Sequence, residues 1–278
     1  MRKKKEVEQP ERLSKIIAVV NHKGGVGKTT TTLTTASIFA KKGFRVLCVD
    51  LDPQANLTLS LLREDAEYET IGDAIVKESD PPVINVFENL DIVPSSLSLA
   101  KLELSLMGVM QREYVITDML KNIKKDYDYI FLDCPPTLGM FTINALVAAN
   151  YAIITMTPEV LPYKGLGSII ILISQIAERL NTQLQCAGIL FTMFEGGKVL
   201  TKNIEVAVRK VYGGLLFDTH IRKNVKVAEA PAERKCLLEY APSSTAFADY
   251  KQFADELLDR FAGKAWPKSA AQPEAKQK

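Results

Sequence analysis

Short apolar runs alternate along the chain with longer segments whose apolar residues recur at helical spacing. The apolar runs cover residues 15–21, 44–50, 90–94, 127–133, 151–157, 184–193 and 215–217. Nearly continuous apolar runs are typical of parallel strands that are buried on both faces. Helical patterns cover residues 29–42, 98–107, 113–125, 140–149, 165–180, 198–211 and 245–261, with short helices predicted between 52 and 62 and at 71–76. This alternation predicts an α/β fold with a doubly wound, mostly parallel sheet and helices on both faces.

Two segments break the alternation, and both termini differ from the rest of the chain. Residues 63–88 are polar and predict an irregular excursion, and residues 219–245 are basic and predict mostly loop. We expect residues 1–13 to form a flexible basic arm and residues 263–278 a disordered tail. With 278 residues, 47% of them hydrophobic, the part between them (14–262) is long enough for one large domain.

The first apolar run leads directly into a glycine-rich stretch that opens the first predicted helix. Its residues are Lys23, Gly24, Gly25, Val26, Gly27, Lys28, Thr29 and Thr30. A strand, a glycine-rich turn and a helix N-terminus in this order form a phosphate cradle, because backbone N–H groups point inward and the helix adds positive potential. Lys28 is placed to reach the β- and γ-phosphates, and the Thr29 hydroxyl to bind Mg²⁺. The position of the usual first glycine holds His22, and Lys23 is an additional lysine within the loop.

Two further strand ends carry carboxylates. Asp50 ends the second predicted strand and Asp52 follows it. Asp50 can therefore be a partner for the metal shell or for the loop lysine, while Asp52 orients a water in line with the γ-phosphate. Asp133 ends the strand 127–133, where a carboxylate can bind Mg²⁺ through a water. Alone, either pattern could be an ordinary capped strand end. Because the carboxyl ends of parallel strands meet at one edge, we expect both beside the phosphate loop.

Basic residues gather late in a chain whose net charge is only +2. The segment 198–235 contains Lys198, Lys202, Arg209, Lys210, Arg222, Lys223, Lys226, Arg234 and Lys235 against Glu205, Asp218, Glu229 and Glu233. Two interpretations stay open from the residues alone: a patch for the DNA backbone, or a solvated helix face. No zinc-finger, helix-turn-helix or RNA-binding signature occurs, so any DNA binding is expected to be independent of sequence.

At this point the motifs resemble the ParA/Soj family of deviant Walker-A partition ATPases. The resemblance rests on KGGVGKTT, VDLDPQAN, FLDCPPTLG and the late segment NVKVAEAP, and it covers residues 15–258. It implies that Lys28 and Thr29 bind the phosphates and Mg²⁺ of ATP or ADP, and that Asp52 positions the attacking water. It also implies that Asp50 and Asp133 support the metal ion.

The resemblance further implies a dimer that closes around ATP. Lys23 reaches across this homodimer to the partner's phosphates, while Thr192, Met193 and the segment 219–225, including Asn224, form the adenine side. ATP-bound dimers of the family bind double-stranded DNA non-specifically through late basic residues, and a ParB-type centromere-binding partner stimulates hydrolysis and release. The expected location is the cytoplasm, on the nucleoid. Two departures are His22, where the family usually has Gln, and Arg222, where many relatives have Pro. Two interpretations of Arg222 stay open: a change in the adenine-side loop, or an additional DNA contact.

Three other functions compete with this one. A MinD-like ATPase binds membrane through a basic amphipathic C-terminal helix, but the charges of 245–261 sum to minus two, so this helix is expected to pack on the core. A nitrogenase-reductase-like carrier needs cysteines that bridge a cluster, and Cys48, Cys134, Cys186 and Cys236 are expected to be small buried thiols. A binding protein with a dead nucleotide site is disfavoured by the intact Lys28, Thr29, Asp52 and Asp133. A signal peptide and a membrane-spanning segment are not expected.

Overall fold

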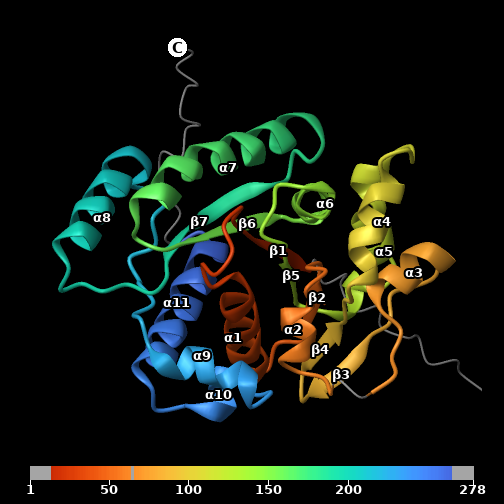
Figure 1. The fold of residues 1–278 in the computed structure, drawn as a ribbon, viewed down its shortest axis with the longest axis horizontal. Coiled ribbons are helices and arrows are strands. Elements are labelled where there is room, and N and C mark those ends of the chain that lie inside the picture. Colours follow the sequence, from red (N-terminus) through yellow and green to blue (C-terminus); the bar gives the residue numbers. More distant parts are fainter. Residues whose placement is uncertain (1–13, 64–65, 265–278) are drawn as a thin grey trace, which may run out of the picture.

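The computed structural model describes residues 14–63 and 66–264, apart from the side chains of 160–164. The predicted arm, residues 1–13, lies outside the described residues. So do residues 265–278 of the predicted tail, which was expected to begin at residue 263. One seven-stranded sheet runs through the described chain (Figure 1). Its strands are β1 (Lys15–Val20), β2 (Val46–Asp50), β3 (Ile84–Phe87), β4 (Leu90–Val93), β5 (Tyr129–Asp133), β6 (Tyr151–Met156) and β7 (Gln185–Phe191).

The strand order is β3-β4-β2-β5-β1-β6-β7, and every neighbouring pair is parallel except β3 with β4. The doubly wound, mostly parallel sheet predicted from the sequence is therefore confirmed. In the register of the sheet Asp50 pairs with Asp133, so these two carboxylates lie side by side at the strand ends. β1 lies between β5 and β6, which places the loop after Val20 at the middle of this edge.

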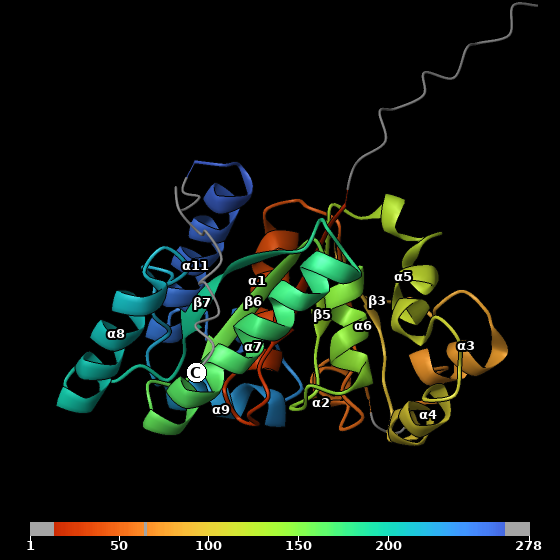
Figure 2. The same ribbon diagram turned by 90° about the horizontal axis from the view of Figure 1, so that it is seen from above.

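Helices cover both faces of the sheet. They are α1 (Lys28–Lys41), α2 (Asn56–Leu59), α3 (Ile71–Lys77), α4 (Ser98–Leu106), α5 (Val115–Leu120), α6 (Met140–Ala148), α7 (Val160–Arg179), α8 (Val199–Tyr212), α9 (Val225–Ala232), α10 (Leu237–Tyr240) and α11 (Thr245–Phe261). The helices α6 and α7 lie on one face, and α1 and α11 lie on the other (Figure 1). Seen from above, α8 lies beyond one end of the sheet, and α3, α4 and α5 gather at the other (Figure 2).

Strand side chains alternate between two hydrophobic cores, as the period of a pleated strand requires. Ala18 of β1 belongs to the core under α6 and α7, while its neighbour Val19 packs into the core under α1 and α11. From α11, Tyr250, Phe253 and Leu257 are fully buried. The prediction that the last helix packs on the core is thus confirmed.

Four local predictions were wrong. The segment 63–88 is not wholly irregular, because it contains the antiparallel edge strand β3, and the segment 219–245 contains α9 and α10. The predicted helix 113–125 is shorter, with α5 flanked by two 3-10 turns, Arg112–Tyr114 and Lys124–Asp126. Residues 215–217 form a single bridge to β7 through Leu216 instead of a strand.

Candidate functional site

The glycine-rich loop after β1 has the shape that its sequence predicts. Gly25 and Gly27 have φ angles of 70° and 81°, the left-handed region that favours glycine. Gly27 is the residue before the first turn of α1, and a Cβ there would lie 3.4 Å from the Thr192 side chain. Asn21 holds the start of the loop, because its Oδ1 accepts from the Lys23 N–H at 2.9 Å. The loop is therefore shaped by its own glycines and by residues at both sides.

Lys28 is 6% exposed and lies at the floor of the loop. Its ammonium donates to the Lys23 carbonyl oxygen at 3.1 Å. Burial lowers the pKa of Lys28, and the Asp133 carboxylate opposes that shift. A partly desolvated ammonium next to backbone N–H groups is suited to bind an anion such as a phosphate.

Asp50 is fully buried, and both of its oxygens accept hydrogen bonds from the chain. Oδ1 accepts from the Asp52 N–H at 3.1 Å, and Oδ2 accepts from the Thr58 N–H at 2.9 Å and the Thr58 hydroxyl at 2.7 Å. Burial raises the pKa of Asp50 to about 6, and these hydrogen bonds act in the opposite direction. Its geometry fits a residue that fixes the loop carrying Asp52, which differs from the metal-supporting role expected from the sequence.

Asp52 lies in the cavity next to the phosphate loop and is 6% exposed. Its Oδ1 accepts from the Gln54 N–H at 2.9 Å, and its carbonyl oxygen accepts from the Ser95 hydroxyl at 2.9 Å. These contacts fix the loop on both sides of the carboxylate. Asp52 is therefore held where it can orient a water molecule.

Asp133 ends β5 and is fully buried. Thr32 donates to its Oδ1 at 3.4 Å, whereas its Oδ2 is buried and has no hydrogen-bond partner within the described part of the chain. Burial and the neighbouring Asp50 charge raise the pKa of Asp133 to about 8, and Thr29 and Lys28 counteract this. An unpartnered buried carboxylate oxygen close to the Thr29 hydroxyl matches the oxygen ligands of a hard cation.

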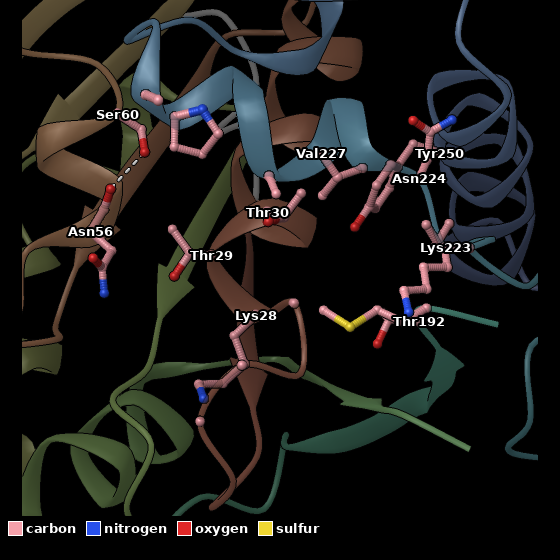
Figure 3. Close-up of a pocket in the computed structure, with 18 of the residues that line it drawn as sticks. Lys28, Thr29, Thr30, Asn56, Ser60, Thr192, Lys223, Asn224, Val227 and Tyr250 are labelled. Carbon is pink, nitrogen blue, oxygen red and sulfur yellow. Dashed lines mark hydrogen bonds between the residues drawn. The ribbon is translucent and has the colours of Figure 1, made fainter. Parts of the chain in front are cut away.

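A cavity of about 920 Å³ extends from the phosphate loop to residues 221–225 and helix α9. Its lining includes Gly24, Gly25, Gly27, Lys28, Thr29, Thr30, Asp52, Thr192, Met193, Ile221, Arg222, Lys223, Asn224, Val227 and Tyr250. Figure 3 shows Lys28 and Thr29 on one side and α9, with Val227, across from them. The predicted phosphate side and the predicted base side therefore meet in one cavity.

The residues predicted for the base side also hold the loops in place. The Thr192 hydroxyl donates to the Val26 carbonyl at 2.9 Å, which ties β7 to the phosphate loop. Met193 has a φ of 51° and is partly exposed. Asn224 begins α9, since its Oδ1 accepts from the Lys226 N–H at 2.9 Å, and its amide nitrogen contacts the Thr245 hydroxyl.

Lys23 points away from the cavity that its own loop forms. Its ammonium pairs with the Glu159 carboxylate at 2.8 Å, and it is not among the residues that line the cavity. Both side chains are partly exposed, so solvent weakens the attraction. In this chain alone, Lys23 is thus presented at the surface beside the site.

Most of the predicted DNA-contacting residues have acidic partners in the same chain. The ion pairs are Lys198–Glu195, Lys223–Glu195, Arg209–Glu205, Arg209–Asp218, Arg222–Asp249 and Lys226–Glu229. Arg234 interacts with other residues of the chain as well. In contrast, no ion pair is found among the described residues for Lys202, Lys210 or Lys235. The structure does not bring these residues into one cluster with the cavity, apart from Arg222 and Lys223.

Sequence reasoning missed four residues that build the site. Asn21 and Thr58 hold the loops that carry Lys23 and Asp52, and Tyr250 and Asp249 reach it from α11. Asn21 and Thr58 lie next to recognised motifs and could have been suspected as loop-capping side chains. Nothing in the sequence indicates which distant residue Asp249 or Tyr250 contacts.

Two further expectations can be compared with the structure. Cys48, Cys134 and Cys236 are buried free thiols, as predicted, while Cys186 is partly exposed. Within residues 14–63 and 66–264, no helix combines the length and apolar character that crossing a membrane requires. Over the same residues, no three His, Cys, Asp or Glu side chains are grouped to hold a metal ion by themselves.

The doubly wound sheet, the phosphate loop at its central strand and the two flanking carboxylates define a P-loop nucleotide-hydrolase fold. The family model described as "AAA domain" matches residues 14–186. The chain is 37% identical over 251 residues to the sporulation initiation inhibitor protein Soj of Bacillus subtilis, covering 88% of this chain and 98% of the relative. It is 33% identical to the chromosome-partitioning ATPase Soj of Treponema pallidum, covering 89% of this chain and 98% of the relative.

A solved structure shows the same fold. Cobyrinic acid a,c-diamide synthase from Mycobacterium smegmatis, with bound ATP analogue and magnesium, superposes with a TM-score of 0.80 at 29% identity. That match covers 92% of this chain and 99% of the other. The chain therefore belongs to the ParA/Soj family of P-loop ATPases.

Proposed function

We propose that this protein is a Mg²⁺-dependent ATPase that partitions DNA. The observation that carries the proposal is the meeting of Lys28, Thr29, Asp52 and Asp133 at one sheet edge, beside a cavity large enough for a nucleotide. In the proposed complex the loop N–H groups and Lys28 bind the β- and γ-phosphates of ATP. Asp52 orients the attacking water and accepts its proton.

The residues present also fit a magnesium ion. The Thr29 hydroxyl and the unpartnered Oδ2 of Asp133 are the oxygens that would hold it, together with phosphate oxygens and waters. The ion would neutralise charge on the transferring phosphoryl group. Asp50 is assigned to the Asp52 loop, because its oxygens already accept from Thr58 and from the Asp52 N–H.

The finer part of the proposal is an ATP-controlled homodimer. Lys23 lies at the surface in this chain, where it can reach the phosphates of a second copy after leaving Glu159. Dimerisation doubles the basic surface around α8 and thereby strengthens binding to double-stranded DNA of any sequence. A ParB-type partner would stimulate hydrolysis and so release the protein from the nucleoid. The name of the chromosome-partitioning Soj relative supports the partition function on which this finer part rests.

A mobility-shift assay on unrelated double-stranded DNA tests the proposal. The wild type should shift DNA with ATP or a non-hydrolysable analogue and not with ADP, and Lys23→Gln should lose the shift while still binding ADP. An equal DNA mobility shift with ADP and with ATP would contradict the proposal that ATP controls DNA binding. Strong ATP-dependent binding to anionic vesicles, without a DNA shift, would favour the MinD-like alternative instead.

A further inference from the structure

The wall of the cavity opposite the phosphate loop is formed by residues 221–224. This wall is hydrogen-bonded to the end of β7, because the Ile221 N–H donates to the Phe191 carbonyl at 2.8 Å. It also contacts the last helix, α11, whose other face packs on the sheet together with α1. The position of the wall relative to the phosphates thus depends on how α11 holds it.

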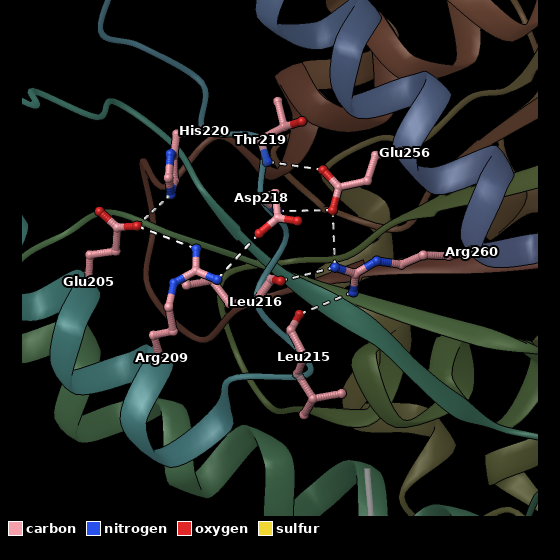
Figure 4. A network of polar contacts seen from close by, with 9 residues as sticks. All are labelled: Glu205, Arg209, Leu215, Leu216, Asp218, Thr219, His220, Glu256 and Arg260. Carbon is pink, nitrogen blue, oxygen red and sulfur yellow. Dashed lines mark hydrogen bonds and ion pairs between the residues drawn. The ribbon is translucent and has the colours of Figure 1, made fainter. Parts of the chain in front are cut away.

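Two carboxylates on α11 hold the segment that leads into this wall. Glu256 accepts from the N–H groups of Asp218 at 2.9 Å and Thr219 at 3.0 Å, as Figure 4 shows. Asp249 accepts from the Arg222 N–H at 2.9 Å. The two acids are separated by about two helical turns and therefore face the same side of α11. They hold the backbone of 218–222 at both ends.

At Arg222 the side chain adds a second attachment. Its Nε donates to Asp249 Oδ2 at 2.9 Å, and its Nη2 donates to Oδ1 at 2.6 Å. Asp249 is only 7% exposed, and hydrogen bonding to it raises the pKa of Arg222. A bidentate pair of this kind fixes the plane of the guanidinium as well as its distance. Arg222 also lines the cavity.

The residue next to Asp249 connects this wall to the phosphate side. Tyr250 is fully buried, lines the same cavity, and has its hydroxyl 3.2 Å from the Thr31 hydroxyl of α1. Since α1 begins at the phosphate loop, α11 links the two sides of the cavity through adjacent residues. A change at the Arg222–Asp249 pair should therefore shift one side of a bound nucleotide relative to the other.

We infer that Arg222 is a positioning residue for the nucleotide: paired with Asp249, it fixes the base-side wall of the cavity against the phosphate-binding helix. The inference rests on the proposed nucleotide site and deepens it. It reassigns Arg222, which the sequence placed among the DNA contacts. The Arg222 side chain is 55% exposed, but its guanidinium is bound to the buried Asp249 carboxylate, which offsets its charge and fixes its direction. We therefore expect Arg222 to contribute to nucleotide affinity more than to the DNA surface.

The test compares three variants by ADP binding and by ATP hydrolysis. Arg222→Ala and Asp249→Asn should each raise the Kd for ADP and the KM for ATP about tenfold, while kcat at saturating ATP stays within twofold of the wild type. Arg222→Lys should recover part of the affinity, because lysine keeps the charge and loses the bidentate geometry. The matched control is Asp255→Asn, which breaks the pair between Asp255 of α11 and Lys42 at the end of α1, away from the cavity.

Several outcomes would overturn the inference. ADP affinities of Arg222→Ala and Asp249→Asn within twofold of the wild type would contradict it, as would an equal loss in Asp255→Asn. Loss of DNA binding in Arg222→Ala at saturating ATP analogue, with unchanged ADP affinity, would return Arg222 to the DNA surface. If Asp249→Asn does not fold, the comparison of Arg222→Ala with Arg222→Lys decides. Failure of the wild type to bind ADP would instead contradict the proposed function.

Discussion

At the scale of single residues, Asp52 is the carboxylate whose role can be isolated. Asp52→Asn keeps an oxygen for the Gln54 N–H and so preserves the loop, but it removes the base that accepts a proton from water. We expect single-turnover ATP hydrolysis to fall about 100-fold or more, since general base catalysis contributes about 10²–10⁴. ADP affinity should change little, because the phosphates bind to the loop and Lys28.

The measurement is phosphate release after mixing with excess enzyme, alongside ADP titration. Asp259→Asn is a suitable control, because Asp259 is an exposed α11 residue paired with Lys264 far from the cavity. Hydrolysis by Asp52→Asn at the wild-type rate would require another residue to orient the water.

The buried acids also predict how stability depends on pH in protein free of nucleotide and Mg²⁺. Burial raises the pKa of Asp133 to about 8, so the folded chain binds this proton more tightly than the unfolded chain does. The stabilisation is complete below the pKa of an unfolded aspartate, about 4, and is lost progressively as pH rises from there to the folded pKa, about 8. Each kcal/mol lost lowers Tm by about 2–4 °C for a chain of this size class.

Thermal melts between pH 5 and pH 9 measure this effect. The wild type should lose several degrees between pH 5 and about 8, and its Tm should level off above that, because both states are then ionised. Asp133→Asn should lose less, because an amide does not ionise. Equal slopes for the two proteins would show that Asp133 is not the responsible group. Adding Mg²⁺ and ADP should also reduce the wild-type slope, since the cation favours the ionised carboxylate.

At the scale of elements, α4 and the residues just before it connect the loop that carries Asp52 to the start of α6. Ser95, just before α4, donates to the Asp52 carbonyl, and Glu103 within α4 accepts from the Met140 N–H at 2.7 Å. Met140 begins α6, directly after the Pro135-Pro136 loop that follows Asp133. An acid at a helix N-terminus satisfies a free N–H group and interacts favourably with the helix dipole.

We therefore predict that Glu103→Ala loosens the start of α6. The cost of losing such a contact is about 1 kcal/mol, which corresponds to roughly fivefold faster amide exchange in residues 137–142. Hydrogen exchange measured by mass spectrometry would detect this change. Glu103→Gln keeps an oxygen acceptor and should retain most of the protection. Uniformly faster exchange over the whole sheet would instead indicate global destabilisation.

The elements that the sequence identified are those whose apolar residues are buried on a regular period. β1, β2 and β5 are buried along their whole length apart from Lys15, and their patterns gave both the strands and the sheet edge. β3 is a partly exposed edge strand, so its alternation is weak beside Pro81-Pro82. Helix α9 was not predicted for a different reason. It buries few residues, and it contains Pro231 within its last turn.

The residues of the candidate site also fall into two groups, those set by local sequence and those set by contacts between distant elements. Gly25, Gly27 and Lys28 were predicted because the loop geometry follows from neighbouring residues along the chain. The Arg222–Asp249 pair joins residues from two separate elements, and its partners are chosen by how α11 packs against the sheet. Periodicity and local motifs contain no information about such a pairing. The hydrogen bonds from Thr58 to Asp50 likewise join two separate elements and cannot be deduced from a local motif.

At the scale of the whole molecule, the net charge of +2 does not show which lysine and arginine side chains are free of acidic partners. Glu195 pairs with both Lys198 and Lys223, so its one negative charge offsets one of their two positive charges. Lys202 and Lys210 of α8 have no ion pair among the described residues. Since α8 lies at one end of the sheet (Figure 2), its outer side is open to a large partner. The available charge, and not the total count of lysines and arginines, should set the DNA affinity.

This leads to paired predictions of opposite sign for the ATP-bound protein. The double variant Lys202→Ala/Lys210→Ala should weaken binding to every duplex alike and reduce the slope of log K against log salt, by at most about 1.8 per protomer. Glu195→Gln should strengthen binding, because it removes the one negative charge that pairs with both Lys198 and Lys223. Fluorescence anisotropy on two unrelated duplexes at several salt concentrations measures both effects. Lys251→Ala, on α11, serves as a control for the loss of one exposed charge. A Glu195→Gln protein with unchanged affinity and slope would show that Lys198 and Lys223 lie outside the DNA surface, and would limit that surface to α8.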